Sequence, residues 1–151
     1  MSSLTGSRVN WRRTRCERAV VDPVLLDSSF LIDLEREIEA GLAGPAVEWL
    51  RKNRSRRSRA LLVSCVSAAE FLEGCEEPEK GKSFIGRYVP QGLGFQHATK
   101  YAEIQRRAAQ KGRRFGENDA WQLAFAERAN AFLVGRDRRA FEHLGPRYER
   151  Y

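Results

Sequence analysis

The sequence has few of the residues that build disulfide-linked or zinc-held frameworks. It contains three cysteines, Cys16, Cys65 and Cys75, without a Cys-x-x-Cys pair, and two histidines, His97 and His143, without a partner at i+3 or i+4. An odd number of isolated cysteines fits neither a disulfide scaffold nor a thiolate zinc site. We therefore expect reduced thiols, with Cys65 buried as a small apolar residue, and histidines that are not metal ligands.

Long apolar runs are absent as well. No stretch of about 18 or more apolar residues could span a bilayer, and the first residues, MSSLTGSRVNWRRTRCERAVVDP, lack the apolar segment of a secretory signal. With 42% hydrophobic and 31% charged residues in a chain of 151, the composition is that of one soluble globular domain. These features predict a cytoplasmic protein that does not associate with membranes.

Acidic residues are fewer than basic ones, and the basic excess is concentrated in two segments. The formal net charge is +7; residues 1–20 hold five arginines and one glutamate, and RKNRSRRSR (51–59) holds six cations and no acid. Such segments suit the phosphates of a nucleic acid, although a disordered leader and a solvated helix end would have the same composition. We expect a flexible basic leader over 1–20 and a folded domain over 21–151. The candidates for nucleic-acid binding are Arg51, Lys52, Arg54, Arg56, Arg57 and Arg59.

Apolar runs of strand length alternate with helical patterns along the domain. The predicted strands are Val24–Leu26, ALLVSCVS (60–67) and AFLVG (131–135). The predicted helices start after Asp27 and at Pro45, cover 98–112 and 117–131, and end with a short one over 137–145 before a final strand or tail. This alternation predicts an α/β fold, a three-layer α/β/α arrangement with a small, mostly parallel central sheet of about four to five strands.

Two local patterns make finer predictions. Ser67 and Glu70 match the S-x-x-E capping box, which predicts a helix that opens at Ser67. Residues 76–96 contain two prolines and several glycines, which predict a short helix, a loop and a brief strand around Leu93–Phe95.

Four carboxylates fall at strand ends or helix starts. They are Asp27, Glu70, Asp119 and Asp137. Ligands bind at the carboxyl ends of parallel strands, so these acids are expected to converge at one edge of the sheet. Carboxylates that lie close together repel and raise one another's pKa, and such a cluster is normally found with a divalent cation. Because no paired histidine or cysteine joins them, the sequence favours Mg²⁺ or Mn²⁺ over zinc.

Each of these acids also has a simpler explanation, since Asp and Glu commonly cap helices. Three further acids, Asp33, Glu73 and Glu117, lie nearby in the sequence. Glu73 and Glu117 are expected to point to solvent or to support the site from outside, and Asp33 is expected to lie away from the strand end. Asp33 follows Asp27 by six residues, which carries it about 9 Å along a helix.

Four segments resemble, in order, the four acidic motifs of PIN-domain ribonucleases. They are VLLDSSFLIDL (24–34), VSAAEFLEG (66–74), NDAWQLAFA (118–126) and LVGRDRRAFEHL (133–144). Their spacing and the short chain are similar to the VapC toxins of bacterial toxin-antitoxin pairs, over roughly residues 22–147.

The resemblance implies a metal-dependent ribonuclease. It assigns Asp27, Glu70, Asp119 and Asp137 to a catalytic Mg²⁺ or Mn²⁺ site and makes Ser28 and Asn118 supporting polar residues. It also implies cleavage of structured RNA, a homodimer, and inhibition by a cognate antitoxin bound over the site.

Gly135 departs from the family pattern, because many relatives have threonine there and its hydroxyl is missing in this chain. This leaves open a second interpretation, a PIN-like domain that binds RNA or protein with little or no turnover. A phosphatase that forms an aspartyl phosphate would need a second aspartate two residues after Asp27, where this chain has Ser29.

Overall fold

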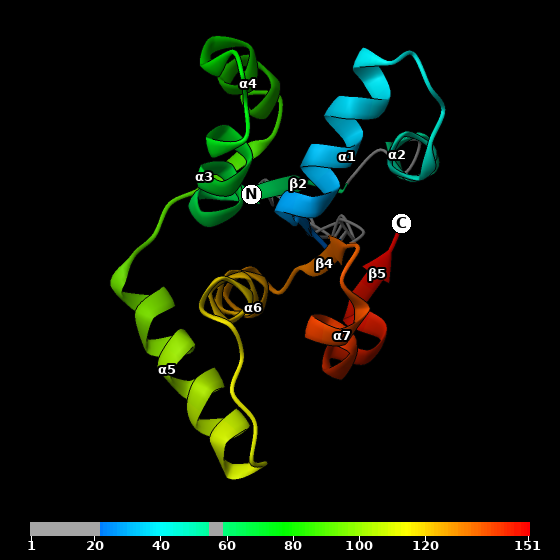
Figure 1. Cartoon of the computed structure of the whole chain (residues 1–151). Coiled ribbons are helices and arrows are strands. Elements are labelled where there is room, and N and C mark those ends of the chain that lie inside the picture. The colour runs from blue at the N-terminus through cyan, green and yellow to red at the C-terminus, as the bar shows by residue number, and fades with distance from the viewer. Residues whose placement is uncertain (1–21, 55–58) are drawn as a thin grey trace, which may run out of the picture.

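Five short strands form one parallel sheet at the centre of the molecule (Figure 1). The computed structural model describes residues 22–54 and 59–151, so the predicted basic leader lies outside the described residues. The strands are β1 (Val24–Leu26), β2 (Leu61–Ser64), β3 (Val89–Gln91), β4 (Phe132–Gly135) and β5 (Tyr148–Arg150). Their order across the sheet is β3-β2-β1-β4-β5, which confirms the predicted small parallel sheet.

The register of the central strands aligns their carboxyl ends. Leu26, the last residue of β1, is level with Val63 of β2 on one side and with Val134 of β4 on the other. Residues that follow these three strands therefore emerge at the same edge of the sheet. Asp27 and Asp137 are among them.

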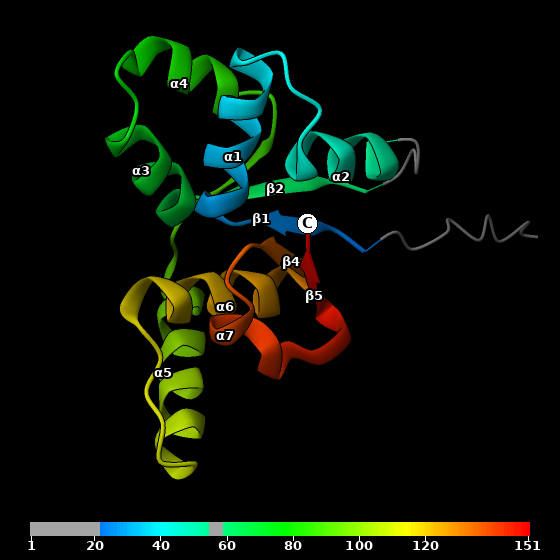
Figure 2. The same ribbon diagram turned by 45° about the vertical axis from the view of Figure 1, so that its right-hand side comes forward.

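Helices cover both faces of the sheet, as Figure 2 shows. The first side carries α1 (Ser28–Glu39), α2 (Pro45–Arg54), α3 (Cys65–Glu73) and α4 (Pro78–Ile85). The second carries α5 (Phe95–Gln110), α6 (Glu117–Ala129), α7 (Arg138–Phe141) and the 3₁₀ turn η1 (Glu142–Arg147). The three-layer α/β/α arrangement is thus confirmed.

Alternate side chains of β1 pack into two separate hydrophobic cores, one on each face of the sheet. Val24 and Leu26 pack with Phe30 and the other apolar residues of α1–α4, whereas Leu25 packs with Leu123 and the apolar residues of α5–α7. All three β1 residues are fully buried, as expected for a strand with helices on both faces. The two cores fix β1 from both sides and, with it, the position of Asp27.

The predicted strand over 60–67 is too long, because a helix starts inside it. Ser64 is the N-cap of α3, and its hydroxyl accepts a hydrogen bond from the Ser67 amide at 3.0 Å. The prediction of a capping box formed by Ser67 and Glu70 is therefore wrong, since Ser64 already satisfies that amide. Cys65, predicted to be buried, is exposed in the first turn of α3.

The predicted strand around Leu93–Phe95 is also misplaced. The strand found there, β3, lies at Val89–Gln91 and includes Pro90, while Phe95 already begins α5. Proline has no N–H to donate to a sheet, and β3 can include it because it is an edge strand.

The described part of the chain contains no helix that is both long and apolar enough to cross a membrane.

His97 packs its ring against Phe125, with 4.3 Å between ring centroids, and accepts a hydrogen bond from the Gly94 amide.

Candidate metal centre

Asp27 is the first residue after β1 and the N-cap of α1. Its Oδ2 accepts hydrogen bonds from the Ser29 amide at 3.3 Å and the Ser29 hydroxyl at 2.7 Å, and the residue is 9% exposed. Burial raises the pKa of the Asp27 carboxyl; the bonds from Ser29 oppose this rise, and the charge of Glu70 adds to it. The carboxylate is held in one orientation at a place that disfavours an uncompensated negative charge.

The hydroxyl that supports Asp27 belongs to Ser29, whereas the predicted Ser28 contributes a backbone amide that lowers the pKa of Asp27. The Ser29 hydroxyl also accepts a hydrogen bond from the Arg136 amide at 3.1 Å. It thereby joins the start of α1 to the loop after β4. The signal for Ser29 was its place two residues after an N-cap aspartate, where the cap oxygen usually bonds.

Gly135, the last residue of β4, lies directly against Asp27. A Cβ at this position would be 3.1 Å from Asp27 Cβ and 3.2 Å from Asp27 Oδ2. The neighbouring Val134 carbonyl accepts a hydrogen bond from the Asp27 amide at 2.9 Å. The missing side chain at position 135 gives the Asp27 carboxylate room to sit close to the β4 backbone.

Asp119 lies in the first turn of α6 and is half-buried. Burial is the main cause of its raised pKa, and the charges of Asp27, Asp137 and Glu70 raise that pKa further. All four predicted acids therefore interact electrostatically although they come from four separate segments.

Glu70 and Asn118 connect α3 to the start of α6. The Asn118 side-chain amide donates a hydrogen bond to Glu70 Oε1. Asn118 precedes Asp119, so this bond orients Glu70 toward the segment that carries the third acid. The supporting role that the resemblance implies for Asn118 stays a prediction.

A buried polar network lies beneath these acids and was not predicted from the sequence. The Ser64 hydroxyl donates to Gln122 Oε1 at 3.1 Å, and the Gln122 side-chain amide donates to the Ser67 hydroxyl. Gln122 is 1% exposed, and both serines are fully buried. The network ties α3 to α6 three residues before Glu70 and three after Asp119. The one available signal was a glutamine within the apolar stretch AWQLAFA (120–126).

Asp137 is exposed and caps the short helix α7. Its Oδ1 accepts hydrogen bonds from the amides of Arg139 at 2.9 Å and Ala140 at 3.2 Å. Tyr148 of β5 lies near it and donates its hydroxyl to the Gly135 carbonyl at 2.9 Å. Burial and then the charges of Asp27 and Asp137 raise the pKa of Tyr148 to about 12, so this hydroxyl remains a neutral donor.

The four acids have the oxygen donors that a hard divalent cation prefers, but their side chains are not yet close enough together to coordinate one. Among residues 22–54 and 59–151, no group of three or more His, Cys, Asp or Glu side chains is close enough to hold a metal ion as the side chains stand. Their donors are all carboxylate oxygens, which Mg²⁺ and Mn²⁺ prefer. Burial first and repulsion second raise the pKa of Asp27 and Asp119, and a cation among the acids would offset both effects.

A second polar cluster stands beside Asp27 at the same end of α1. Asp33 accepts two hydrogen bonds from the Arg136 guanidinium, at 2.9 and 3.2 Å, and one from the Tyr151 hydroxyl at 2.6 Å. The Tyr151 hydroxyl also lies 3.1 Å from the Ser29 carbonyl. Asp33 thus fixes the loop between Gly135 and Asp137 through Arg136 and Tyr151, a role that its helical spacing did not predict.

Arg59, at the end of the basic segment 51–59, precedes β2 and so lies at the amino edge of the sheet, away from the acids. Arg59 pairs with Glu149 at 3.2 Å and lies over the ring of Phe132, the first residue of β4, at 5.2 Å. Arg51 pairs with Glu48 at 2.9 Å on α2. Arg56, Arg57 and the side chain of Arg54 are outside the described residues. Lys52 is exposed on α2.

Known protein folds are similar to this one over most of its length. VapBC2 from Rickettsia felis, solved on a DNA fragment from its promoter, has a TM-score of 0.67 and 20% identity and covers 85% of this chain and 98% of its own. DNA-bound VapBC from Salmonella typhimurium has a TM-score of 0.66 and 22% identity, covering 86% and 98%. VapC20 from Mycobacterium tuberculosis, described as a sarcin-ricin loop cleaving toxin, has a TM-score of 0.55 and 14% identity. The match covers 81% of this chain and 95% of VapC20.

No curated protein sequence matches the chain. The family model of the PIN domain matches residues 24–145, a span that contains β1 to α7 and all four acids. On this match, the protein belongs to the PIN domain family.

Proposed function

We propose that the protein is a Mg²⁺- or Mn²⁺-dependent endoribonuclease, the toxin of a toxin-antitoxin pair. The observation that carries the proposal is that Asp27, Glu70, Asp119 and Asp137 all lie within the span that the PIN domain model matches, with Asp27 and Asp137 after neighbouring parallel strands. The raised pKa of Asp119, caused by burial first and then by the charges of the other three acids, supports it. Repulsion among carboxylates in a partly buried place lowers stability without a compensating cation, so a binding role is a good reason for the arrangement.

In this proposal Asp27, Glu70, Asp119 and Asp137 would hold the metal. A bound Mg²⁺ or Mn²⁺ supplies activation of a water molecule and neutralises charge at the phosphate. Ser29 fixes Asp27 and Asn118 orients Glu70, so two of the acids are positioned before any substrate arrives.

The reaction is hydrolysis of an RNA phosphodiester. The water oxygen bonds to phosphorus, the bond from phosphorus to the 3′ oxygen breaks, and that oxygen takes up a proton. The products are a 5′-phosphate and a 3′-hydroxyl. A 2′,3′-cyclic phosphate would instead show attack by the ribose hydroxyl and would contradict this mechanism.

A cognate antitoxin and a homodimer complete the proposal. Several similar folds were solved as complexes described as VapBC or as a toxin-antitoxin complex, which supports a protein partner for this chain.

Calorimetric titration of Mn²⁺ into the wild type and Asp27→Asn, together with cleavage of total RNA, tests the function. The control is Glu73→Gln, which removes an exposed acid one turn beyond Glu70. We expect the wild type and control to bind metal and cut RNA and Asp27→Asn to do neither. A wild type that binds no metal would refute catalysis and favour the alternative, a PIN-fold module that binds RNA or protein without turnover.

A further inference from the structure

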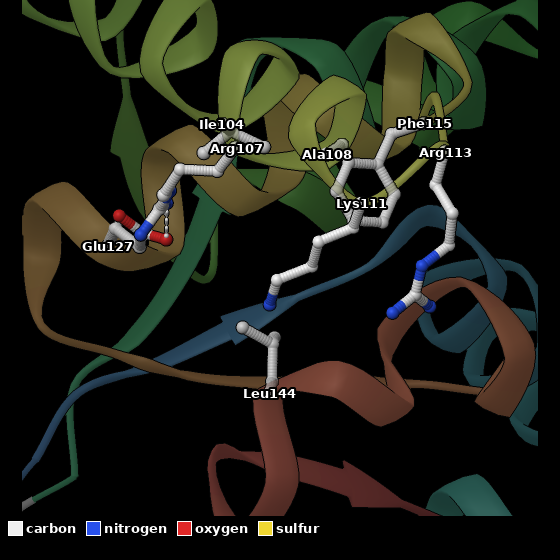
Figure 3. A pocket seen from close by; sticks show the side chains of 8 residues that line it. All are labelled: Ile104, Arg107, Ala108, Lys111, Arg113, Phe115, Glu127 and Leu144. Atoms are coloured by element: carbon white, nitrogen blue, oxygen red, sulfur yellow. Dashed lines mark hydrogen bonds and ion pairs between the residues drawn. The ribbon is translucent and has the colours of Figure 1, made fainter.

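A separate pocket of about 220 Å³ lies between α5, the segment before α6, and η1 (Figure 3). Its apolar wall consists of Ile104, Ala108, Phe115 and Leu144, and its charged rim of Arg107, Lys111, Arg113 and Glu127. The volume is below the roughly 300–1,000 Å³ of pockets for whole drug-sized ligands. It is suited to a flat ring or a phosphate group, not to a large metabolite.

The charges of the rim do not cancel. The Glu127 carboxylate forms ion pairs with Arg107, at 2.5 Å, and with Lys100, at 3.7 Å. Within the described residues, the side chains of Lys111 and Arg113 have no ion-pair partner, and both are exposed. The pocket therefore combines two uncompensated cations with an aromatic and aliphatic wall.

The pocket adjoins the acid site through one short segment. Gln105 holds this segment against α5, since its side chain bonds both the amide and the carbonyl of Phe115, at 3.3 and 3.1 Å. Phe115 is four residues before Asp119, so their backbones are at most about 14 Å apart. A second hollow is lined by the next four residues of the chain, Gly116, Glu117, Asn118 and Asp119.

We infer that this pocket binds one nucleotide of the RNA strand near the scissile bond, with Lys111 and Arg113 on a phosphate and the apolar wall at Phe115 against a base. The inference rests on the proposed function. Stacking of bases on aromatic side chains and pairing of phosphates with cations are the two usual means of holding single-stranded RNA without reading its sequence. The strand would pass over residues 111–116 between the pocket and the acids.

Lys111 and Arg113 could also have a purely structural role, and the test must distinguish that role from RNA binding. Lys111 and Arg113 follow the end of α5, and positive charge stabilises the carboxyl end of a helix. A purely structural role would change the melting temperature and leave RNA affinity as it is.

The experiment measures binding of a labelled single-stranded RNA by fluorescence anisotropy in EDTA, over a range of salt concentrations. The test variants of the full chain are Lys111→Gln/Arg113→Gln and Phe115→Leu. The matched control is Lys82→Gln/Arg106→Gln, which removes the same two charges from exposed positions outside the pocket. Melting temperatures identify any variant that fails to fold.

We expect the Lys111/Arg113 variant to bind RNA more weakly than the control. The plot of log K against log salt concentration should become shallower, its slope smaller in magnitude by about 1 to 1.5. Phe115→Leu keeps an apolar side chain and should weaken binding about 5- to 100-fold with the slope unchanged. Affinity equal to that of the control in both test variants would overturn the inference, as would pocket-dependent binding of an acidic peptide in place of RNA.

Cleavage by the wild type in Mn²⁺ separates the two proposals. If the wild type cuts RNA but the pocket variants bind RNA like the control, the inference fails and the nuclease stands. If the wild type neither binds nor cuts RNA, the proposed function fails and the inference with it.

Discussion

The backbone of Gly135 and the carboxylate of Asp27 are so close that a Cβ at position 135 would lie 3.2 Å from Asp27 Oδ2. Most side-chain contacts in proteins are looser than this, so any residue larger than glycine must displace the first acid by a few tenths of an ångström. The sequence predicted only the loss of a hydroxyl at position 135, whereas in the structure the missing side chain also leaves room for Asp27 beside β4. Four predictions follow from this and neighbouring contacts.

Gly135→Ala should displace Asp27 and weaken metal binding. Overpacking at a buried position costs about 1 to 3 kcal/mol of unfolding free energy, and the lower half of that range is expected because Asp27 is at the edge of the core. Calorimetry with Mn²⁺ and urea unfolding measure both effects. Gly92→Ala is the matched control, since a Cβ there meets no atom within 4 Å. Equal Mn²⁺ affinity in Gly135→Ala and the wild type would contradict the prediction.

Asp27→Asn should not destabilise the metal-free protein at neutral pH. The folded state raises the pKa of Asp27 above its ordinary value of 3.8, so as pH rises the unfolded chain loses this proton first. The favourable protonated state is therefore present at low pH, and stability declines as pH rises through the raised pKa. Asparagine carries no charge and caps helices as well as aspartate does.

Melting temperatures in EDTA between pH 4 and pH 8 test this. Asp27→Asn is expected to match or exceed the wild type at the upper end of the range. Asp27→Ala, which loses the cap, should be less stable by about 1 kcal/mol. A clear drop for Asp27→Asn at pH 8 would show that the charge of Asp27 is already compensated by the protein.

Gln122→Leu should reduce both stability and metal affinity. The substitution removes the link between α3 and α6 and leaves the buried hydroxyl of Ser67 without its amide donor, a loss of about 1 to 3 kcal/mol. Glu70 and Asp119 then lose one of the two links that fix them relative to each other, and the Asn118–Glu70 bond remains. Urea unfolding and Mn²⁺ calorimetry measure the two effects. The control is Gln110→Leu at an exposed position of α5, which should change stability by less than about 0.5 kcal/mol. Unchanged Mn²⁺ affinity in Gln122→Leu would assign the network to folding alone.

Tyr148 should make the fold sensitive to alkaline pH. Its pKa rises from 10.0 to about 12 on folding, so its contribution to stability is complete below pH 10 and is lost as the pH rises toward 12. Tyr148→Phe, which cannot ionise, should lose stability less steeply over that interval in urea unfolding measured at stepped pH. Identical slopes for the two proteins would place the sensitivity elsewhere.

Much of the architecture followed from local sequence. The β1 residues Val24–Leu26 are apolar and are buried on both faces, and the order of strands and helices was enough to predict a parallel three-layer fold. The acids Asp27 and Asp137 were located because residues that directly follow parallel strands must meet at one edge. These properties depend on periodicity and chain direction, which a sequence states directly.

What the sequence could not determine are contacts between segments that are distant along the chain. The start of α3 depended on Ser64, which is satisfied by Gln122 from α6, and β3 could include Pro90 because no strand lies beyond it. The bond that the Arg136 amide donates to the Ser29 hydroxyl and the approach of Gly135 to Asp27 likewise require β1 and β4 to be neighbours. Sequence determined which residues could form the site, whereas tertiary packing decided their orientation and charge environment, because burial and electrostatic repulsion depend on distances between side chains and not on their order.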